Sequence, residues 1–142
     1  MTPTSSSNED NAYAHLYTVM DRYASGNALR LLDSYEPTPT WDDGDIAWVY
    51  DNALVMLALM ARDTATDWER ARVLADSLVY AQDHDPDFAD GRLRDAYSAT
   101  SLIGGDGKAQ IASPGSATGN MAWTVIAWLG YWRAKGETSY LE

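Results

Sequence analysis

Nine consecutive apolar residues, ALVMLALMA, run from Ala53 to Ala61 and limit the possible folds more than any other stretch of the chain. We expect them to form the second half of a helix from Asp45 to Arg62. A helix that is apolar on every side is normally enclosed by other elements. The chain of 142 residues is long enough to build one such core in a single domain.

A second segment of this kind, TGNMAWTVIAWLGYWRA, predicts an enclosed helix from Thr118 to Ala134 that Gly136 ends. Amphipathic patterns predict two more helices, one from Asn8 to about Gly26 and one from Thr66 to Asp83. The letters ETSYLE after Gly136 are typical of the opening turn of a fifth helix. Amphipathic and enclosed helices therefore alternate, as an outer and an inner layer of helices require.

This alternation predicts an all-α fold of antiparallel helical hairpins, with about four to five helices. A faint internal repeat places Asn52 and Asn120 at matching positions near the beginning of the two enclosed helices. We expect residues 1–8 to be a disordered tail and residues 9–142 to form the helical domain. The segment from His84 to Ala117 is rich in Gly, Asp and Ser, which predicts a long loop that could contain a short helical turn or a strand pair.

Composition and charge exclude several classes of protein. A net charge of −11 disfavours nucleic acid as a partner, because phosphate contacts depend on Lys and Arg. Cysteine is absent and His15 and His84 are isolated in the sequence, so we expect no disulfide, no metal site and no cofactor. No long apolar run predicts a membrane span, and MTPTSSSNED has no signal-peptide pattern. We expect a cytoplasmic protein, or a secreted one whose leader is absent from this sequence.

Four short motifs carry a resemblance to a known family. They are VYDNAL at 49–54, LVYAQDHD at 78–85, FADGRLRDAY at 88–97 and TGNMAW at 118–123. With these motifs in this order, the chain from about residue 10 onward resembles the N-terminal portion of bacterial six-hairpin glycosidase-like proteins, which form an (α/α) toroid. The resemblance implies inner helices whose N-termini face a central cleft, where a carbohydrate binds and where carboxylates carry out any catalysis.

The candidate catalytic residues are acids around the start of the first enclosed helix, namely Asp43, Asp45 and Asp51. Glycoside hydrolysis generally uses two carboxyl groups about 5 to 9.5 Å apart, one of which stays protonated. Acids in this position also cap helices, because the free amide groups of a helix N-terminus favour negative charge. Neither inner-helix opening contains the Glu that toroid glycosidases often use.

The candidate substrate-binding residues combine aromatic rings with amides and carboxylates, and the long loop that carries two of them, Asp90 and Asp95, could fold across the expected cleft or away from it. They are Trp41, Trp48, Tyr50, Asn52, Asp90, Asp95 and Asn120. Asn52 and Asn120 suit either a ligand or a buried polar network. Trp123, Trp128 and Trp132 are more typical of core packing. The acidic run DHDPDFADG is typical of a solvated loop and departs from the calcium-binding EF-hand pattern.

Two functions follow as hypotheses. The first is a carbohydrate-active protein related to glycoside hydrolases, which binds a saccharide or another small molecule and, given paired carboxylates, hydrolyses it. The alternative is a non-catalytic helical module for assembly or small-ligand binding, which forms a symmetric homodimer because an open half-ring leaves apolar helix flanks exposed.

Overall fold

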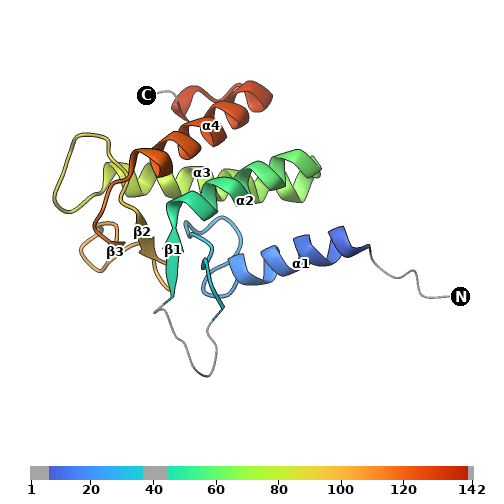
Figure 1. Cartoon of the computed structure of the whole chain (residues 1–142), viewed down its shortest axis with the longest axis horizontal. Coiled ribbons are helices and arrows are strands. Elements are labelled where there is room, and N and C mark those ends of the chain that lie inside the picture. The colour runs from blue at the N-terminus through green and yellow to red at the C-terminus, as the bar shows by residue number, and fades with distance from the viewer. Residues whose placement is uncertain (1–6, 37–44, 141–142) are drawn as a thin grey trace, which may run out of the picture.

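The chain is mostly helical and also contains a small antiparallel sheet (Figure 1). The structure is a computed structural model, which describes residues 7–36 and 45–140. Trp41 and Asp43 therefore lie outside the described residues. The helices are α1 (Asn8–Met20), α2 (Val49–Arg62), α3 (Ala65–Asp83) and α4 (Thr118–Lys135). The prediction of an all-α fold is correct for the helices and wrong for the sheet.

The sheet consists of β1 (Ile46–Trp48), β2 (Ala96–Ser98) and β3 (Ile111–Ser113), in the order β1-β2-β3. The prediction that a helix begins at Asp45 is therefore wrong, because residues 46–48 form β1 and α2 begins at Val49. Residues 46–48 are extended because their backbone pairs with β2, with Ala47 opposite Tyr97. The strand pair that the long loop could contain is present as β2 and β3.

Helices α2 and α4 run side by side in the same direction. Helix α3 packs against both of them and runs in the opposite direction (Figure 1). The α2–α3 connection is short because Asp63 takes a left-handed conformation and the Thr64 side chain accepts a hydrogen bond from the Asp67 amide. Between the helices and the sheet lies one core, whose large members are fully buried. They include Met56, Leu59, Leu74, Leu78 and Tyr97.

Helix α1 ends at Met20, six residues earlier than the predicted end at Gly26. The amphipathic pattern continues to Tyr23, but the buried Arg30 side chain donates from Nε to the Met20 carbonyl at 2.9 Å. The chain after α1 passes over α2 without regular secondary structure, and Leu32 exchanges two hydrogen bonds with Asn52 there. At the other end, Ser7 caps α1, so Asn8 belongs to the helix rather than to the tail.

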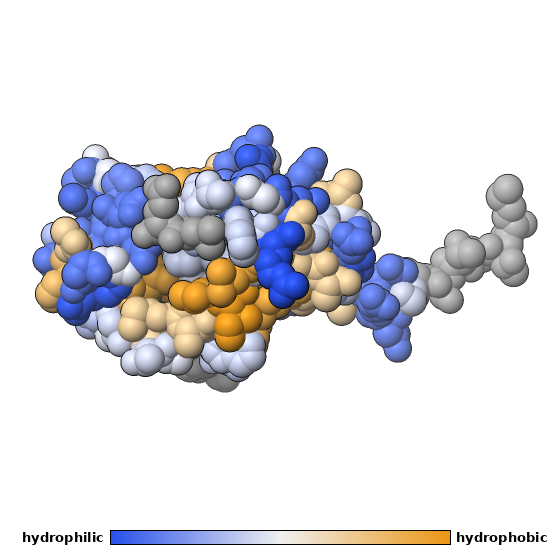
Figure 2. Space-filling view, turned by 90° about the horizontal axis from the view of Figure 1, so that it is seen from above, coloured by the Kyte–Doolittle hydropathy of each residue, from blue (hydrophilic) through white to orange (hydrophobic). Residues whose placement is uncertain are grey.

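Helix α4 spans the predicted residues but is not enclosed. It buries Thr124, Ala127, Trp128 and Tyr131 on its inner side. Its remaining surface exposes four large apolar side chains by 37 to 49%, and Figure 2 shows apolar surface gathered on this side of the molecule. These four are Trp123, Val125, Ile126 and Leu129. A short 3-10 helix, η1 (Thr138–Tyr140), follows α4 where an opening turn was predicted.

Candidate functional site around the N-termini of α2 and α4

Asp95 connects the first turns of the two parallel helices. Its backbone carbonyl accepts a hydrogen bond of 3.0 Å from the Val49 amide, at the beginning of α2. Its carboxylate Oδ1 accepts hydrogen bonds of 2.7 Å from the Ala117 amide and from the Asn120 side-chain amide, at the beginning of α4. Neither helix has a capping side chain of its own at its N-cap residue. Asp95 therefore caps both helices and holds their N-termini together.

Gly115 makes the close approach of Asp95 possible. A Cβ atom at this position would lie 2.1 Å from Asp95 Oδ2, which is far inside van der Waals contact. The Gly115 carbonyl also accepts a hydrogen bond of 2.6 Å from the Asp95 amide. Next to it, the hydroxyl oxygen of Ser116 is buried and has no hydrogen-bond partner among the described residues.

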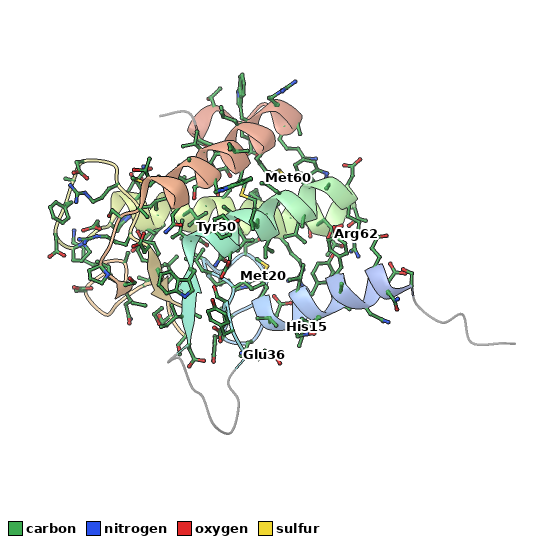
Figure 3. The ribbon with its side chains drawn as sticks, viewed as in Figure 1. His15, Met20, Glu36, Tyr50, Met60 and Arg62 are labelled. Carbon is green, nitrogen blue, oxygen red and sulfur yellow. The ribbon has the colours of Figure 1, made fainter. Side chains whose placement is uncertain are left out.

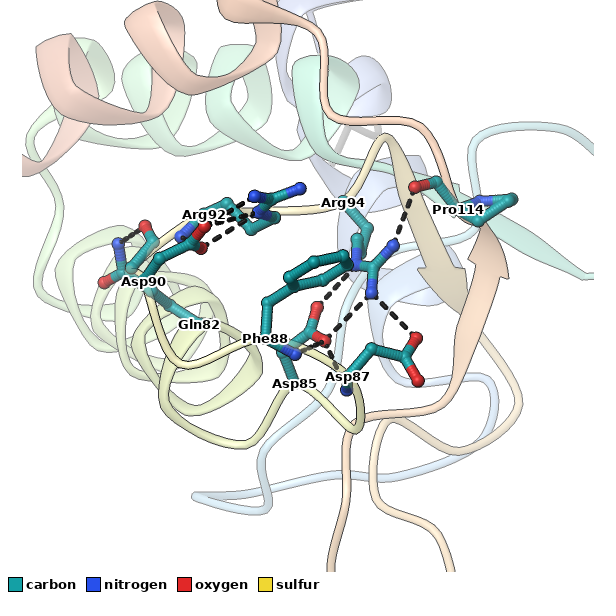
Figure 4. Close-up of polar contacts among 9 residues, drawn as sticks. Gln82, Asp85, Asp87, Phe88, Asp90, Arg92, Arg94 and Pro114 are labelled. Carbon is teal, nitrogen blue, oxygen red and sulfur yellow. Dashed lines mark hydrogen bonds and ion pairs between the residues drawn. The ribbon is translucent and has the colours of Figure 1, made fainter.

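Arg94, the neighbour of Asp95, holds this corner of the fold in place (Figure 4). Its buried guanidinium donates two hydrogen bonds to Asp85, of 2.5 and 2.9 Å, and one of 2.8 Å to the Pro114 carbonyl. These hydrogen bonds hold the pKa of Asp85 at about 2, below its usual value of 3.8. Arg94 thus holds the chain before Gly115, at Pro114, and Asp95 holds the chain after it, at Ala117.

Two aromatic rings lie at the same end of the helix pair. Tyr50 at the beginning of α2 (Figure 3) meets Trp123 of α4 edge to face, with ring centroids 6.0 Å apart. Both rings remain more than a third exposed. Trp123 is thus a surface residue, unlike the buried Trp128, although core packing was expected for both. Trp48, another ring predicted to bind substrate, is half-buried and is the N-cap residue of α2.

Asp51 and Asn52 are neighbours with different environments. Asp51 is half-exposed in the first turn of α2, and none of the described residues forms a hydrogen bond or ion pair with it. Asn52 is fully buried, and its side-chain amide donates to the carbonyls of Leu32 and Trp48 while its oxygen accepts from the Leu32 amide. Asn52 thus stabilises the fold, whereas the Asp51 carboxylate is half-exposed and has no partner among the described residues.

Asp45 lies at the other end of β1 from this site. It has a positive φ of 57° and accepts hydrogen bonds from the hydroxyls of Tyr23 and Thr100. The pKa of Tyr23 is raised, mainly because its hydroxyl donates to the Asp45 carboxylate. The structure thus separates two of the predicted catalytic acids, Asp45 and Asp51, by the length of a strand.

Asp90 is exposed in the loop after α3, where it forms a bidentate ion pair with Arg92. Arg92 and Arg94 both lie over the ring of Phe88, at 3.8 and 4.8 Å from its centroid. Three acids of this run, Asp85, Asp87 and Asp90, are thus paired with arginines. In residues 7–36 and 45–140 no group of three or more His, Asp or Glu side chains is arranged for a metal ion.

The arrangement suits hydrogen bonding and ring stacking more than acid catalysis. Among the described residues, four carboxyl groups have clearly shifted pKa values, those of Asp21, Asp67, Asp85 and Asp90, and all four are lowered. A general acid requires a raised pKa. A cavity of about 500 Å³ lies elsewhere, between α3, α4 and η1.

The sequence did not reveal the roles of Gly115, Arg94 and Trp123. Gly115 and Arg94 act through partners that are distant along the chain, and no local pattern marks such contacts. A signal for the exposure of Trp123 was available, because a helix that is apolar on every side needs a neighbour on every side.

Comparison of the chain with known proteins and structures identified no relative. No family model, no curated protein and no solved structure matches the chain. Among the described residues, no helix has the length and apolar character to cross a membrane.

Proposed function

We propose that the chain binds a saccharide at the N-terminal ends of α2 and α4, as the resemblance to (α/α) toroid glycosidases implies. The observation that carries this proposal is the exposed pair of Tyr50 and Trp123, together with the carboxylate of Asp51 in the same turn of α2, which has no partner among the described residues. Aromatic rings pack against the apolar faces of sugars, and a carboxylate accepts hydrogen bonds from their hydroxyls.

The site is proposed as a binding site rather than as a hydrolytic one. Asp95 is engaged with Ala117 and Asn120, so among the described residues we assign the ligand contact to the carboxylate of Asp51. Hydrolysis needs a second carboxyl group on the other side of the scissile bond. Asp43 is the remaining candidate from the sequence, and it lies outside the described residues.

This proposal can be tested with a panel of oligosaccharides that differ in their sugars and linkages. Thermal shift identifies ligands in the panel, and isothermal titration calorimetry then measures their affinity. A ligand that binds the folded chain raises the melting temperature. We expect Trp123→Ala and Tyr50→Ala to abolish that rise, and Tyr50→Phe to retain it because the ring remains. A panel that leaves the melting temperature of the native chain unchanged, with no heat of binding, would overturn the proposal.

A further inference from the structure

The outer side of α4 forms an apolar ridge with a basic end. Ala122, Ile126, Leu129 and Arg133 follow one another at intervals of three and four residues, so they lie on one side of the helix, and all four are exposed. Ile126 and Leu129 are exposed by 49 and 41%. Large exposed apolar surfaces of this kind mark interaction sites (Figure 2).

A groove runs beside this ridge. It is the cavity of about 500 Å³ between α3 and α4, with Val79 on one wall and Val125 and Leu129 on the other. Tyr140 of η1 closes one part of it and is held there by a hydrogen bond of 2.6 Å from its hydroxyl to Asp76. Asp83, at the end of α3, also lines the groove and is exposed.

We propose that a second copy of the chain covers this face. In the dimer, the α4 ridge of each protomer lies antiparallel to α4 of its partner, in the partner's groove between α3 and α4. The ridge and the groove are neighbours on one surface, and a two-fold axis makes such a surface complementary to itself. The axis passes near Ile126, in the middle of α4.

One charge on the ridge and one charge in the groove favour a second copy as the partner and set its direction. Arg133 lies at the C-terminal end of α4, and Asp83 lies next to the N-terminal half of α4 because α3 runs in the opposite direction. No described residue pairs with either charge. An antiparallel partner therefore brings Arg133 of each protomer to Asp83 of the other, once on each side of the axis.

Other charges limit the strength of this association. The net charge of −11 on each chain opposes it, so the apolar ridge provides the affinity and the two ion pairs fix the register. The proposal does not rest on saccharide binding, because Tyr50 and Trp123 lie on the other flank of α4, against α2.

Sedimentation equilibrium of the full chain tests this interface. We expect a dimer for the native chain and a monomer for Ile126→Asp, with an unchanged circular dichroism spectrum because Ile126 does not belong to the core. The matched control is Ala61→Asp, which adds the same charge at an exposed position of α2 and leaves the dimer intact.

A charge exchange tests the register. We expect Arg133→Asp and Asp83→Arg each to weaken the dimer about tenfold or more, and the double variant to restore most of the loss. A native chain that is monomeric at high concentration, or a dimer that Ile126→Asp leaves intact, would overturn the interface. Two weakened single variants without recovery in the double variant would overturn the antiparallel arrangement.

Discussion

The Asn120 side-chain amide donates a hydrogen bond of 2.7 Å to the Asp95 carboxylate, across 25 residues of sequence. The same carboxylate oxygen accepts from the Ala117 amide, and the Asp95 carbonyl accepts from Val49. One residue of a loop thereby positions two helices, and with them Tyr50 and Trp123. The geometry of the proposed saccharide site depends on this contact rather than on the helices alone.

Replacing Asp95 by Ala should therefore destabilise the fold. The change removes the acceptor for the Ala117 amide and for Asn120, and the loss of a helix cap of this kind costs about 1 to 2 kcal/mol. Urea denaturation followed by circular dichroism measures the free energy of unfolding. Asp90→Ala is the control, because Asp90 pairs only with Arg92 at the surface and should leave the midpoint almost unchanged. Equal midpoints for the two variants would show that Asp95 does not cap the helices.

A methyl group at Gly115 should disturb the same contact from the other side. In Gly115→Ala the added Cβ would lie 2.1 Å from Asp95 Oδ2, so the carboxylate has to move away from α4. We expect a loss of about 1 to 3 kcal/mol. Gly119→Ala provides the comparison, because a Cβ there meets nothing within 4 Å and Ala favours the helix by up to about 1 kcal/mol. If both variants had the same melting temperature, the steric argument would fail.

The ion pair of Asp85 and Arg94 should make stability fall in acid. The folded-state pKa of Asp85 is about 2, below its usual value of 3.8, so the carboxylate contributes stability above pH 3.8 and loses it as the pH falls toward 2. This contribution amounts to roughly 2 kcal/mol. The free energy of unfolding, measured between pH 5 and pH 2.5, should fall less steeply with acid in Asp85→Asn than in the native chain.

The same ion pair can be tested by replacing Arg94, the partner of Asp85. Arg94→Met should destabilise the chain by about 3 to 5 kcal/mol at neutral pH, because it leaves the buried carboxylate of Asp85 without a counter-charge. Destabilisation of this variant should decrease in acid, since protonation removes the uncompensated charge. An Arg94→Met chain as stable as the native one would contradict the role assigned to this pair.

Helices were predictable from the sequence where local signals define them. The bounds of α3 and α4 differ from the prediction by one residue, because Thr64 begins the first and Gly136, with a positive φ of 73°, ends the second. Strand β1 was not predictable, since its extended form depends on pairing with β2, fifty positions later in the chain. The early end of α1 likewise depends on the side chain of Arg30.

The candidate site was predictable in its residue types but not in its geometry. The pattern identified Asp51, Tyr50 and Asn120 as polar or aromatic residues near helix openings, but it left the position of Asp95 in the long loop open. The structure has all four at the N-terminal ends of α2 and α4. It did not distinguish Asn52, which is turned into the core, or Asp45, which lies at the far end of β1. A helix places adjacent residues on different sides, so one position along the sequence separates the half-exposed Asp51 from the buried Asn52.

Asp51 and Asn52 should accordingly respond to substitution in opposite ways. Asn52→Ala removes the partner of the buried Leu32 amide and should cost about 2 to 4 kcal/mol, because that group is then left unsatisfied. Asp51→Asn should leave the free energy of unfolding within about 0.5 kcal/mol of the native value, since no described residue depends on its carboxylate. For any oligosaccharide that the native chain binds, calorimetry should show a loss of affinity in Asp51→Asn. An Asp51→Asn chain with native stability and native affinity would remove Asp51 from the site and leave Tyr50 and Trp123 as its contacts.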